Sequence, residues 1–278
     1  MNKTEQLDFL IRFLSAGTEI PPTIKGFALR CPHSLGHVRA STAATSLRSS
    51  IDDKWRLFRS LVNVREPASI TDDFLAVQNN LLQSMIEEKG ITDVNNLKPM
   101  RNNLYLWRGD ITTLKIGAIV NAANSAMLGC FIPCHACIDN AIHTFAGVQL
   151  RLECANVMRK QGHTEPAGTA KITPAFNLPC NYILHTVGPI IRDTVRNEDK
   201  KLLAGCYRSC LSLAEEHKIE SVAFCCISTG EFHFPNEEAA QVAVNTVSDF
   251  LKTNKYIIKV VFNVFKEQDE IIYRRLLG

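Results

Sequence analysis

From residue 103 onwards, short apolar runs alternate with longer amphipathic stretches, and this alternation is the strongest constraint on the fold. The amphipathic stretches have helical spacing and cover residues 138–160, 200–217, 237–251 and 267–277. Continuous apolar runs that alternate with helices indicate a largely parallel β-sheet covered on both faces. We therefore predict an α/β domain with strands at Leu104–Arg108, Ala118–Ala122, Thr169–Pro174, Tyr182–Thr186, Ser221–Cys226 and Lys259–Val264.

The first 95 residues lack clear signals for buried strands. Apolar residues recur at helical spacing over residues 6–14 and 52–64, and a third helix is predicted over 74–88. Thr71 can cap this third helix and Gly90 can end it. We predict a helical N-terminal region over residues 1–95 and one α/β domain over 96–278. The first region can be a subdomain packed on the rest of the chain or a lid that selects the substrate.

Composition excludes several classes of protein. A formal net charge of +3 without a basic run argues against nucleic-acid binding. No apolar run approaches the about 20 residues of a membrane span, and no signal-like leader opens the chain, so we expect no membrane partner. Several of the ten cysteines lie within apolar runs. Such cysteines indicate thiols or metal ligands in a reducing compartment, and we expect a cytoplasmic protein.

The polar loop after the predicted strand Ala118–Ala122 contains a candidate metal site. Cys130, His135 and Cys137 have the spacing C-x4-H-x-C. Zinc prefers thiolate and imidazole ligands, and three protein ligands leave one coordination position open for chemistry. Cys134 also forms a C-x-x-C pair with Cys137, which is the spacing of redox dithiols. The sequence therefore allows three interpretations of this loop: metal ligands, a redox dithiol or inert thiols.

Three polar residues flank the loop. Asn121 and Asn124 lie where the strand ends, and their amide groups suit ribose hydroxyls, although a turn is the alternative explanation. Asp139 lies in the first turn of the next predicted helix, where a carboxylate stabilises the positive helix end. It can also orient or deprotonate a water molecule. Because a helix N-terminus favours the ionised form, we expect Asp139 to be a better orienter than a strong base.

A second polar loop, Ser228–Pro235, follows the predicted strand Ser221–Cys226 and precedes a helix. Its small residues expose backbone N–H groups, and such concave segments bind phosphate. In a parallel sheet this loop lies at the same edge as the first one. Ser-Thr-Gly is also simply a turn sequence, so the loop alone is weak evidence for a phosphate site.

At these residues the chain resembles the macrodomain family. The shared motifs are GDIT at 109–112, AIVNAAN at 118–124, Asp139 followed by AIH and AG within 141–147, HTVGP at 185–189 and ISTG at 227–230. Most macrodomains have a glycine-rich loop where this chain has residues 129–137. This departure resembles the zinc-containing subclass, microbial protein ADP-ribosylhydrolases of which some are encoded beside sirtuin-type ADP-ribosyltransferases. Members of that subclass also carry a helical N-terminal extension, so the resemblance extends over the whole chain.

The resemblance implies a three-layer α/β/α fold with a mixed, largely parallel sheet. It also implies where an ADP-ribose ligand binds. Asp110 is expected to accept a hydrogen bond from the adenine amino group, beside the backbone of Ile111, and Phe265 is expected to stack on adenine. The implied diphosphate loop consists of Ser228, Thr229, Gly230, Glu231 and Phe232, with the last residue near the distal ribose.

The resemblance further implies the catalytic residues and the cofactor. Asn121 and Asn124 are expected to contact the distal ribose, and Asp139 to act on water. The implied zinc ligands are Cys130, His135 and Cys137, with Cys134 open as a fourth.

The expected activity is zinc-dependent removal of mono-ADP-ribose from modified proteins, with an ester to an acidic side chain as the expected linkage. The expected partners are ADP-ribose as ligand and an ADP-ribosylated protein as substrate. One alternative is a module that binds ADP-ribose without cleaving it, but recognition alone requires neither a metal loop nor Asp139. Deacetylation of O-acetyl-ADP-ribose is a related alternative.

Overall fold

The computed structural model of the chain describes residues 1–16 and 50–278. The predicted N-terminal region contains three described helices, α1 (Lys3–Ser15), α3 (Ile51–Val64) and α4 (Asp72–Lys89). The side chains of Asn2, Ser50 and Thr71 accept hydrogen bonds from the first turns of these helices. Thr71 and Gly90 bound α4 as the sequence predicts. The rest of this predicted region, residues 17–49, lies outside the described residues.

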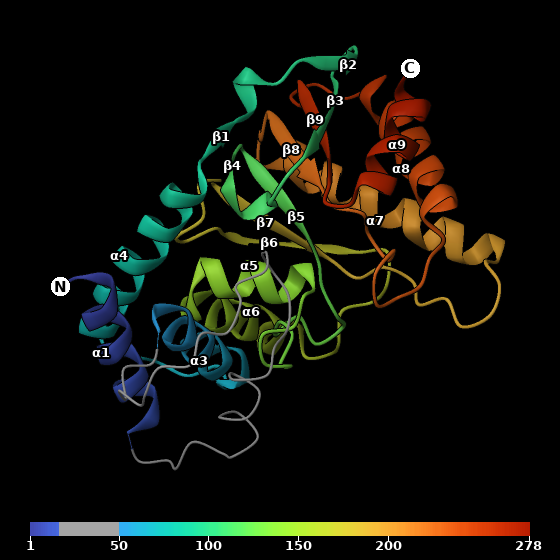
Figure 1. Cartoon of the computed structure of the whole chain (residues 1–278). Coiled ribbons are helices and arrows are strands. Elements are labelled where there is room, and N and C mark those ends of the chain that lie inside the picture. The colour runs from blue at the N-terminus through green and yellow to red at the C-terminus, as the bar shows by residue number, and fades with distance from the viewer. Residues whose placement is uncertain (17–49) are drawn as a thin grey trace, which may run out of the picture.

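A seven-stranded sheet forms the centre of the α/β domain (Figure 1). Its strands are β2 (Pro99–Arg101), β3 (Leu104–Arg108), β5 (Ala118–Ala122), β6 (Ala170–Pro174), β7 (Tyr182–Thr186), β8 (Ser221–Phe224) and β9 (Lys259–Val264). Their order in space is β2-β3-β9-β8-β5-β7-β6. The five inner strands pair in parallel, whereas the edge strands β2 and β6 are antiparallel to their neighbours.

Helices cover both faces of the sheet (Figure 1). One face carries α5 (Ile138–Ala146) and α6 (Val148–Gln161), and the N-terminal helices lie on this side, where α3 and α4 contact α5. The other face carries α7 (Asn197–Glu216), α8 (Asn236–Leu251) and α9 (Glu267–Leu277). The predicted three-layer α/β/α class with a mixed, largely parallel sheet is thus confirmed. Among the described helices, none combines the length and the apolar character that crossing a bilayer requires.

The N-terminal helices and the α/β domain share one hydrophobic core. Leu10 of α1 and Leu81 of α4 are fully buried and belong to the same cluster as Val120 of β5. A short parallel pairing of β1 (Thr92–Asp93) with β4 (Leu114–Lys115) also joins the two regions. The N-terminal helices are therefore packed on the rest of the chain, and the boundary between residues 95 and 96 stays a prediction.

Several predicted elements have different bounds in the structure, and two of these differences have a clear local cause. The helix predicted over 138–160 is divided at Gly147, whose φ of +99° ends α5 and begins α6. The positive φ favours glycine here, and a Cβ would also lie 2.6 Å from the side-chain amide of Gln78 and displace it. Strand β8 ends at Phe224, because the carbonyl of Cys226 accepts from Thr229 within a turn. Strands β1, β2 and β4 have only two or three residues, too few for a periodic signal.

The chain connections diverge at β5, and this determines where a ligand can bind. From β5 the chain passes through α5 and α6 to β6 and β7 on one side, and it reaches β8 on the other side through α7 on the opposite face (Figure 1). Ligands of open α/β sheets bind at such a switch point, outside the carboxyl ends of the strands. The loops after β3, β9, β8, β5 and β7 all lie at this edge.

The shared core predicts that a substitution in α4 destabilises the whole chain. We expect Leu81→Ala to lower the free energy of unfolding by about 2–5 kcal/mol, because it removes a fully buried side chain and leaves a cavity. The exposed Glu87 on the same helix is the matched control, and Glu87→Ala should change stability by no more than about 0.5 kcal/mol. Urea denaturation followed by far-UV circular dichroism measures both. An unchanged midpoint for Leu81→Ala would contradict a shared core.

Candidate active site

The loop 123–137 joins β5 to α5 and is held against the sheet. Ala123 N donates to the carbonyl of the last residue of β7 at 2.9 Å, and Asn124 O closes the next turn by accepting a backbone hydrogen bond of 2.9 Å. Gly129 has a φ of +81°, and a Cβ there would lie 2.8 Å from the ring of His143 on α5. The loop therefore lies directly over α5, and its close approach requires glycine.

The three predicted metal ligands come together in this loop. The ligand atoms of Cys130, His135 and Cys137 all lie within 4.8 Å of one another, and the three residues are half-buried. His135 Nδ1 is 3.5 Å from Cys130 Sγ. Two thiols and one imidazole form a donor set that zinc prefers, and three protein ligands leave one position of a tetrahedral ion open. The donor set therefore fits zinc, whose presence stays a prediction.

Cys137 is the N-cap of α5, where its Sγ accepts a hydrogen bond from Asn140 N at 3.4 Å. A helix N-terminus favours a thiolate. Burial outweighs this effect and, together with the neighbouring Cys130 and Asp139, raises the pKa of Cys137 to about 12. A nearby cation, such as a bound metal ion, would therefore be needed to ionise this thiol at neutral pH.

Cys134 faces a different part of the molecule from the other three. Its Sγ contacts Ser60 Oγ at 3.3 Å and the carbonyl of Arg56 at 3.4 Å, both on α3. A redox dithiol with Cys137 and a role as fourth metal ligand would both require Cys134 to turn away from α3.

A buried polar cluster lies behind the loop, where β5 ends. Asn121 Nδ2 donates to Asp139 Oδ1 at 2.8 Å and lies 3.1 Å from His185 Nδ1. Asn121 Oδ1 finds no donor among the described residues, so it retains acceptor capacity. Asp139 is only 5% exposed, and burial raises its pKa to about 6, against the hydrogen bond from Asn121 and the charge of Arg151. The expectation that the helix N-terminus weakens Asp139 as a base is therefore wrong, because burial dominates.

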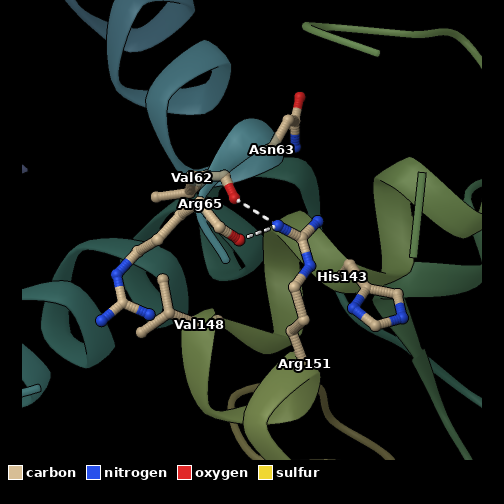
Figure 2. A pocket seen from close by; sticks show the side chains of 7 residues that line it. Val62, Asn63, Arg65, His143, Val148 and Arg151 are labelled. Atoms are coloured by element: carbon tan, nitrogen blue, oxygen red, sulfur yellow. Dashed lines mark hydrogen bonds between the residues drawn. The ribbon is translucent and has the colours of Figure 1, made fainter. Parts of the chain in front are cut away.

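His143 lies one turn beyond Asp139 on α5, with Nε2 3.6 Å from Asp139 Oδ1. Burial, reinforced by His185 and Arg151, holds the pKa of His143 well below its ordinary value. The ring is therefore neutral beside the carboxylate. Neither of its nitrogens has a hydrogen-bond partner among the described residues. Figure 2 shows the ring beside a cavity of about 10 Å³, close to the space of one water molecule, between α5, α6 and the end of α3.

Arg151 of α6 lines this cavity and also binds the end of α3 and the metal-ligand loop (Figure 2). Its Nη1 donates to the carbonyls of Val62 at 3.0 Å and Arg65 at 2.5 Å, at the C-terminal end of α3. Its Nε donates to Leu128 O at 2.7 Å, and the guanidinium lies 4.3 Å from the ring centroid of Phe131. A buried cation thus caps α3 and anchors the metal-ligand loop at the same time.

Asn124 lies at the same strand end as Asn121, but its amide group serves the loop. Its Nδ2 donates to Gly129 O at 3.1 Å, and its Oδ1 accepts from Ala126 N at 3.0 Å. The predicted contact with a ribose therefore requires Asn124 to share or exchange these bonds.

The second loop, 225–235, lies beside the first because β5 and β8 pair in parallel. Ser228 has a φ of +65°. A Cβ on Gly188, in the segment after β7, would lie 1.9 Å from Ser228 Oγ, so the close approach of this segment to the second loop needs glycine at position 188. Phe234 N donates to Ser228 O at 2.9 Å and closes the loop. Within the described part of the chain, no group accepts from the backbone N–H groups of Gly230, Glu231 and Phe232. Successive free donors of this kind suit an anion.

The other residues of this loop connect it to its neighbours. Thr229 Oγ1 donates to the backbone carbonyl three residues earlier at 3.0 Å. Phe232 O accepts from Ile191 N at 2.8 Å, in the segment after β7. Glu231 Oε1 lies 3.6 Å from His135 Nε2, so the predicted diphosphate loop and the metal-ligand loop meet at these two side chains.

Asp110 and Phe265 follow the neighbouring strands β3 and β9 at the far end of the same edge. Asp110 accepts from Lys89 Nζ at 2.8 Å and from Thr112 N at 3.0 Å. Burial acts to raise the pKa of Asp110, but Lys89 and Thr112 outweigh it and lower the pKa, so the carboxylate is ionised. Ile111 is buried, and Phe265 is 78% exposed.

Four residues of the site were not assigned roles by the sequence interpretation: His143, Arg151, His185 and Lys89. His185 is a histidine inside an apolar strand, and this is a usable signal for a buried polar partner. His143 has the helical spacing to Asp139, but spacing alone does not distinguish it from an ordinary core histidine. The contacts of Arg151 and Lys89 join segments that are distant in the sequence, so no local pattern predicts them.

Comparison with known proteins gives consistent matches. The family model described as "Macro domain" matches residues 120–243. A Treponema medium protein named "Protein-ADP-ribose hydrolase" is 58% identical over 231 residues, which cover 82% of this chain and 88% of that protein.

Solved structures agree with these matches. A Trypanosoma brucei macrodomain in complex with ADP-ribose has a TM-score of 0.62 and 28% identity, over 79% of this chain and 95% of that chain. A mutant Oceanobacillus iheyensis macrodomain with ADPR has a TM-score of 0.59 and 38% identity, over 65% of this chain and 95% of that chain.

The buried His185 predicts a specific pH dependence of stability. Burial lowers its pKa from 6.5 to about 3, so the native state binds fewer protons than the unfolded state in this interval. Its contribution to stability is complete above the unfolded pKa and is lost as the pH falls towards the folded pKa. Between about pH 6 and about pH 4, we expect His185→Gln to reduce the slope of unfolding free energy against pH by about 1.4 kcal/mol per unit.

Urea denaturation at several pH values measures this slope. His217 is exposed, and His217→Gln is the matched control for the loss of an imidazole. A His185→Gln variant with the slope of the unaltered chain would contradict a neutral buried ring.

Proposed function

The chain belongs to the macrodomain family, and from this premise we propose that it is a zinc-dependent hydrolase that removes mono-ADP-ribose from modified proteins. The relative named as a protein-ADP-ribose hydrolase, at 58% identity, supports the reaction. The observation that carries the zinc dependence is the Cys130, His135 and Cys137 cluster, whose ligand atoms lie within 4.8 Å of one another beside the Asp139 cluster. The absence of a disulfide among the described cysteines supports a reducing compartment such as the cytoplasm.

The order of groups along the sheet edge matches an extended dinucleotide-like ligand. Adenine binds at the ends of β3 and β9, where Asp110 accepts from its amino group and Phe265 stacks on it. The diphosphate binds at the end of β8 on the free N–H groups of residues 230–232. The distal ribose binds at the end of β5 beside Asn121. The distance from β3 to β5 spans three strand spacings, about 14 Å, so one ligand can contact all three places.

Hydrolysis breaks the bond between the distal ribose C1 and a side-chain oxygen of the modified protein. Asn121 holds Asp139 by a hydrogen bond of 2.8 Å and offers Oδ1 to a ribose hydroxyl. Asp139 accepts a proton from water, and its pKa of about 6 leaves it mostly ionised at neutral pH and more basic than an exposed carboxylate. The oxygen of that water becomes the new hydroxyl on ribose. A zinc ion bound by the three ligands would supply Lewis-acid stabilisation at the ribose.

We propose an ester to Asp or Glu as the linkage. A carboxylate leaves as a stable anion, whereas a serine alkoxide must take up a proton as it leaves. Asp139 is the acidic group beside the ribose end, and it is ionised at neutral pH, so it has no proton to donate at the start of the reaction. This favours a leaving group that needs none.

Two other functions use the same groove. A module that only binds ADP-ribose would need the diphosphate loop and Asp110 but neither the Cys/His cluster nor a carboxylate of raised pKa. Deacetylation of O-acetyl-ADP-ribose cleaves a small ester at the same ribose and can accompany the proposed reaction.

Removal of the metal is the direct test of zinc dependence. We expect chelator-treated protein to lose release of ADP-ribose from a mono-ADP-ribosylated protein, by about 100-fold or more, and to regain it with zinc. Each of Cys130→Ala, His135→Ala and Cys137→Ala should lose bound zinc, measured by elemental analysis, together with turnover. The matched control is Cys134→Ser, because serine can still donate to the Arg56 carbonyl that Cys134 contacts. Full turnover in verified metal-free protein would contradict the proposal.

Matched peptides test the linkage. We expect release from a peptide ADP-ribosylated on Glu to be at least about 10-fold faster than from the same peptide ADP-ribosylated on Ser, because only the first leaving group needs no proton. Mass spectrometry of the freed peptide measures both rates. Equal rates would overturn the ester assignment, and no release from either peptide, with ADP-ribose still bound, would favour the binding module.

A further inference from the structure

The metal-ligand loop rests on α3, a helix of the N-terminal region that the reaction itself does not use. Three side chains on one side of α3 contact the loop and the start of α5: Arg59, Ser60 and Asn63. They lie at positions i, i+1 and i+4 of the helix, so Arg59 and Asn63 are one turn apart on the same face. This contact is separate from the chemistry of the site, because none of the three belongs to the Cys130, His135 and Cys137 cluster.

Arg59 makes the contact closest to the predicted ligands. Its Nη2 donates to the backbone carbonyl of His135 at 2.9 Å and to Asn140 Oδ1 at 2.7 Å, and its Nε donates to the same Oδ1 at 3.2 Å. Two of the three hydrogen bonds form a fork on one acceptor, a geometry that guanidinium can make and an ammonium group cannot.

Asn140 in turn contacts the loop on both sides of His135. Its Nδ2 donates to Ile132 O at 3.0 Å, before His135, and its backbone N donates to Cys137 Sγ at 3.4 Å, after it. Asn140 is fully buried, so its amide cannot replace the lost partner with bulk water if Arg59 is removed. One guanidinium on α3 therefore fixes a closed set of bonds around residues 132–140.

The backbone of the loop needs such support. Cys134 has a φ of +52°, a left-handed conformation that costs a non-glycine residue free energy. Asn63 Oδ1 accepts from Cys134 N at 2.9 Å, and Asn63 Nδ2 donates to Thr144 Oγ1 of α5 at 3.1 Å. Contacts from α3 thus hold Cys134, the residue before His135, in its strained left-handed conformation.

We propose that Arg59 is a positioning residue for the metal, and that α3 is the scaffold on which the ligand set is assembled. This inference rests on the proposed function in one respect, that the bound cation is zinc. Contacts behind a metal ligand determine how well it is oriented, and losing one typically weakens metal affinity by about 10–100-fold. Helix α3 then contributes to catalysis through the metal loop.

Zinc affinity is the primary measurement, by competition with a chromogenic chelator on the full chain. We expect Arg59→Lys and Arg59→Gln to weaken zinc binding by about 10–100-fold. In the cobalt-substituted protein, the same variants should shift or weaken the visible absorption bands, which report the arrangement of the ligands around the ion. Arg56 lies one turn earlier on α3, and Arg56→Lys and Arg56→Gln are the matched controls that should leave affinity and spectrum unchanged.

The outcomes separate this inference from the proposed function. Equal zinc affinity and equal cobalt spectra for the Arg59 variants and the unaltered chain would overturn the role of Arg59 and leave the zinc enzyme in place. An unaltered chain that binds no zinc would overturn both. If Arg59→Gln does not fold, Arg59→Lys carries the test, because it keeps the charge and removes only the fork. Thermal unfolding of the metal-free proteins verifies that the compared variants are equally folded.

Discussion

The parallel pairing of β5 with β7 on one side and β8 on the other is the constraint on which the rest of the site depends. It places the polar residue Asn121 near the end of a largely buried strand, where its amide must find partners inside the protein. Asp139 and His185 supply partners for its Nδ2, and in doing so they join the strand to α5 and to the neighbouring strand. The same pairing brings the loops after β5 and β8 together, so that Glu231 approaches His135.

The chemistry at Asp139 is decided by a competition between two physical effects. A helix N-terminus stabilises a carboxylate by about 0.3–1 kcal/mol. Burial raises the pKa from 3.8 to about 6, and each pKa unit corresponds to about 1.4 kcal/mol, so the burial effect is larger. The neighbouring His143 is kept neutral by its own burial and adds no positive charge that would reverse this result. A carboxylate at a helix end can therefore be a useful base when the protein also removes it from water.

The N-terminal helices complete the site from behind. Arg151 donates to the carbonyls at the end of α3 and to the loop, whereas Arg59 donates from α3 to the loop and to α5. Two arginine side chains thus bridge α3 and the α/β domain, one extending from each of the two parts. Each satisfies carbonyl groups that would otherwise be left without partners in a partly buried interface. The packing of a helical region on the α/β domain is in this way also the support of the metal-ligand loop.

The sequence by itself determined the elements and their class. Continuous apolar runs identified β3, β5, β7 and β9 with their observed bounds, because strands inside a parallel sheet carry a nearly uninterrupted apolar signal. The spacing of Cys130, His135 and Cys137 likewise placed the three donors on one short loop, and that closeness in sequence carried over into space. The break at Gly147 escaped this reasoning, since a left-handed residue inside a helical pattern has no period of its own.

Only the tertiary structure decided the properties that depend on burial and on distant contacts. Asp139 has its raised pKa because the fold encloses it, and sequence position alone predicts the opposite. Cys134 and Cys137 share a familiar spacing, yet the packing of α3 turns Cys134 away from the other donors. The hydrogen bonds of Arg59 join residues more than seventy positions apart. Local sequence signals propagate over a few residues, whereas desolvation and buried hydrogen bonds are set by the assembled chain, and this physical difference divides what could be predicted from what had to be observed.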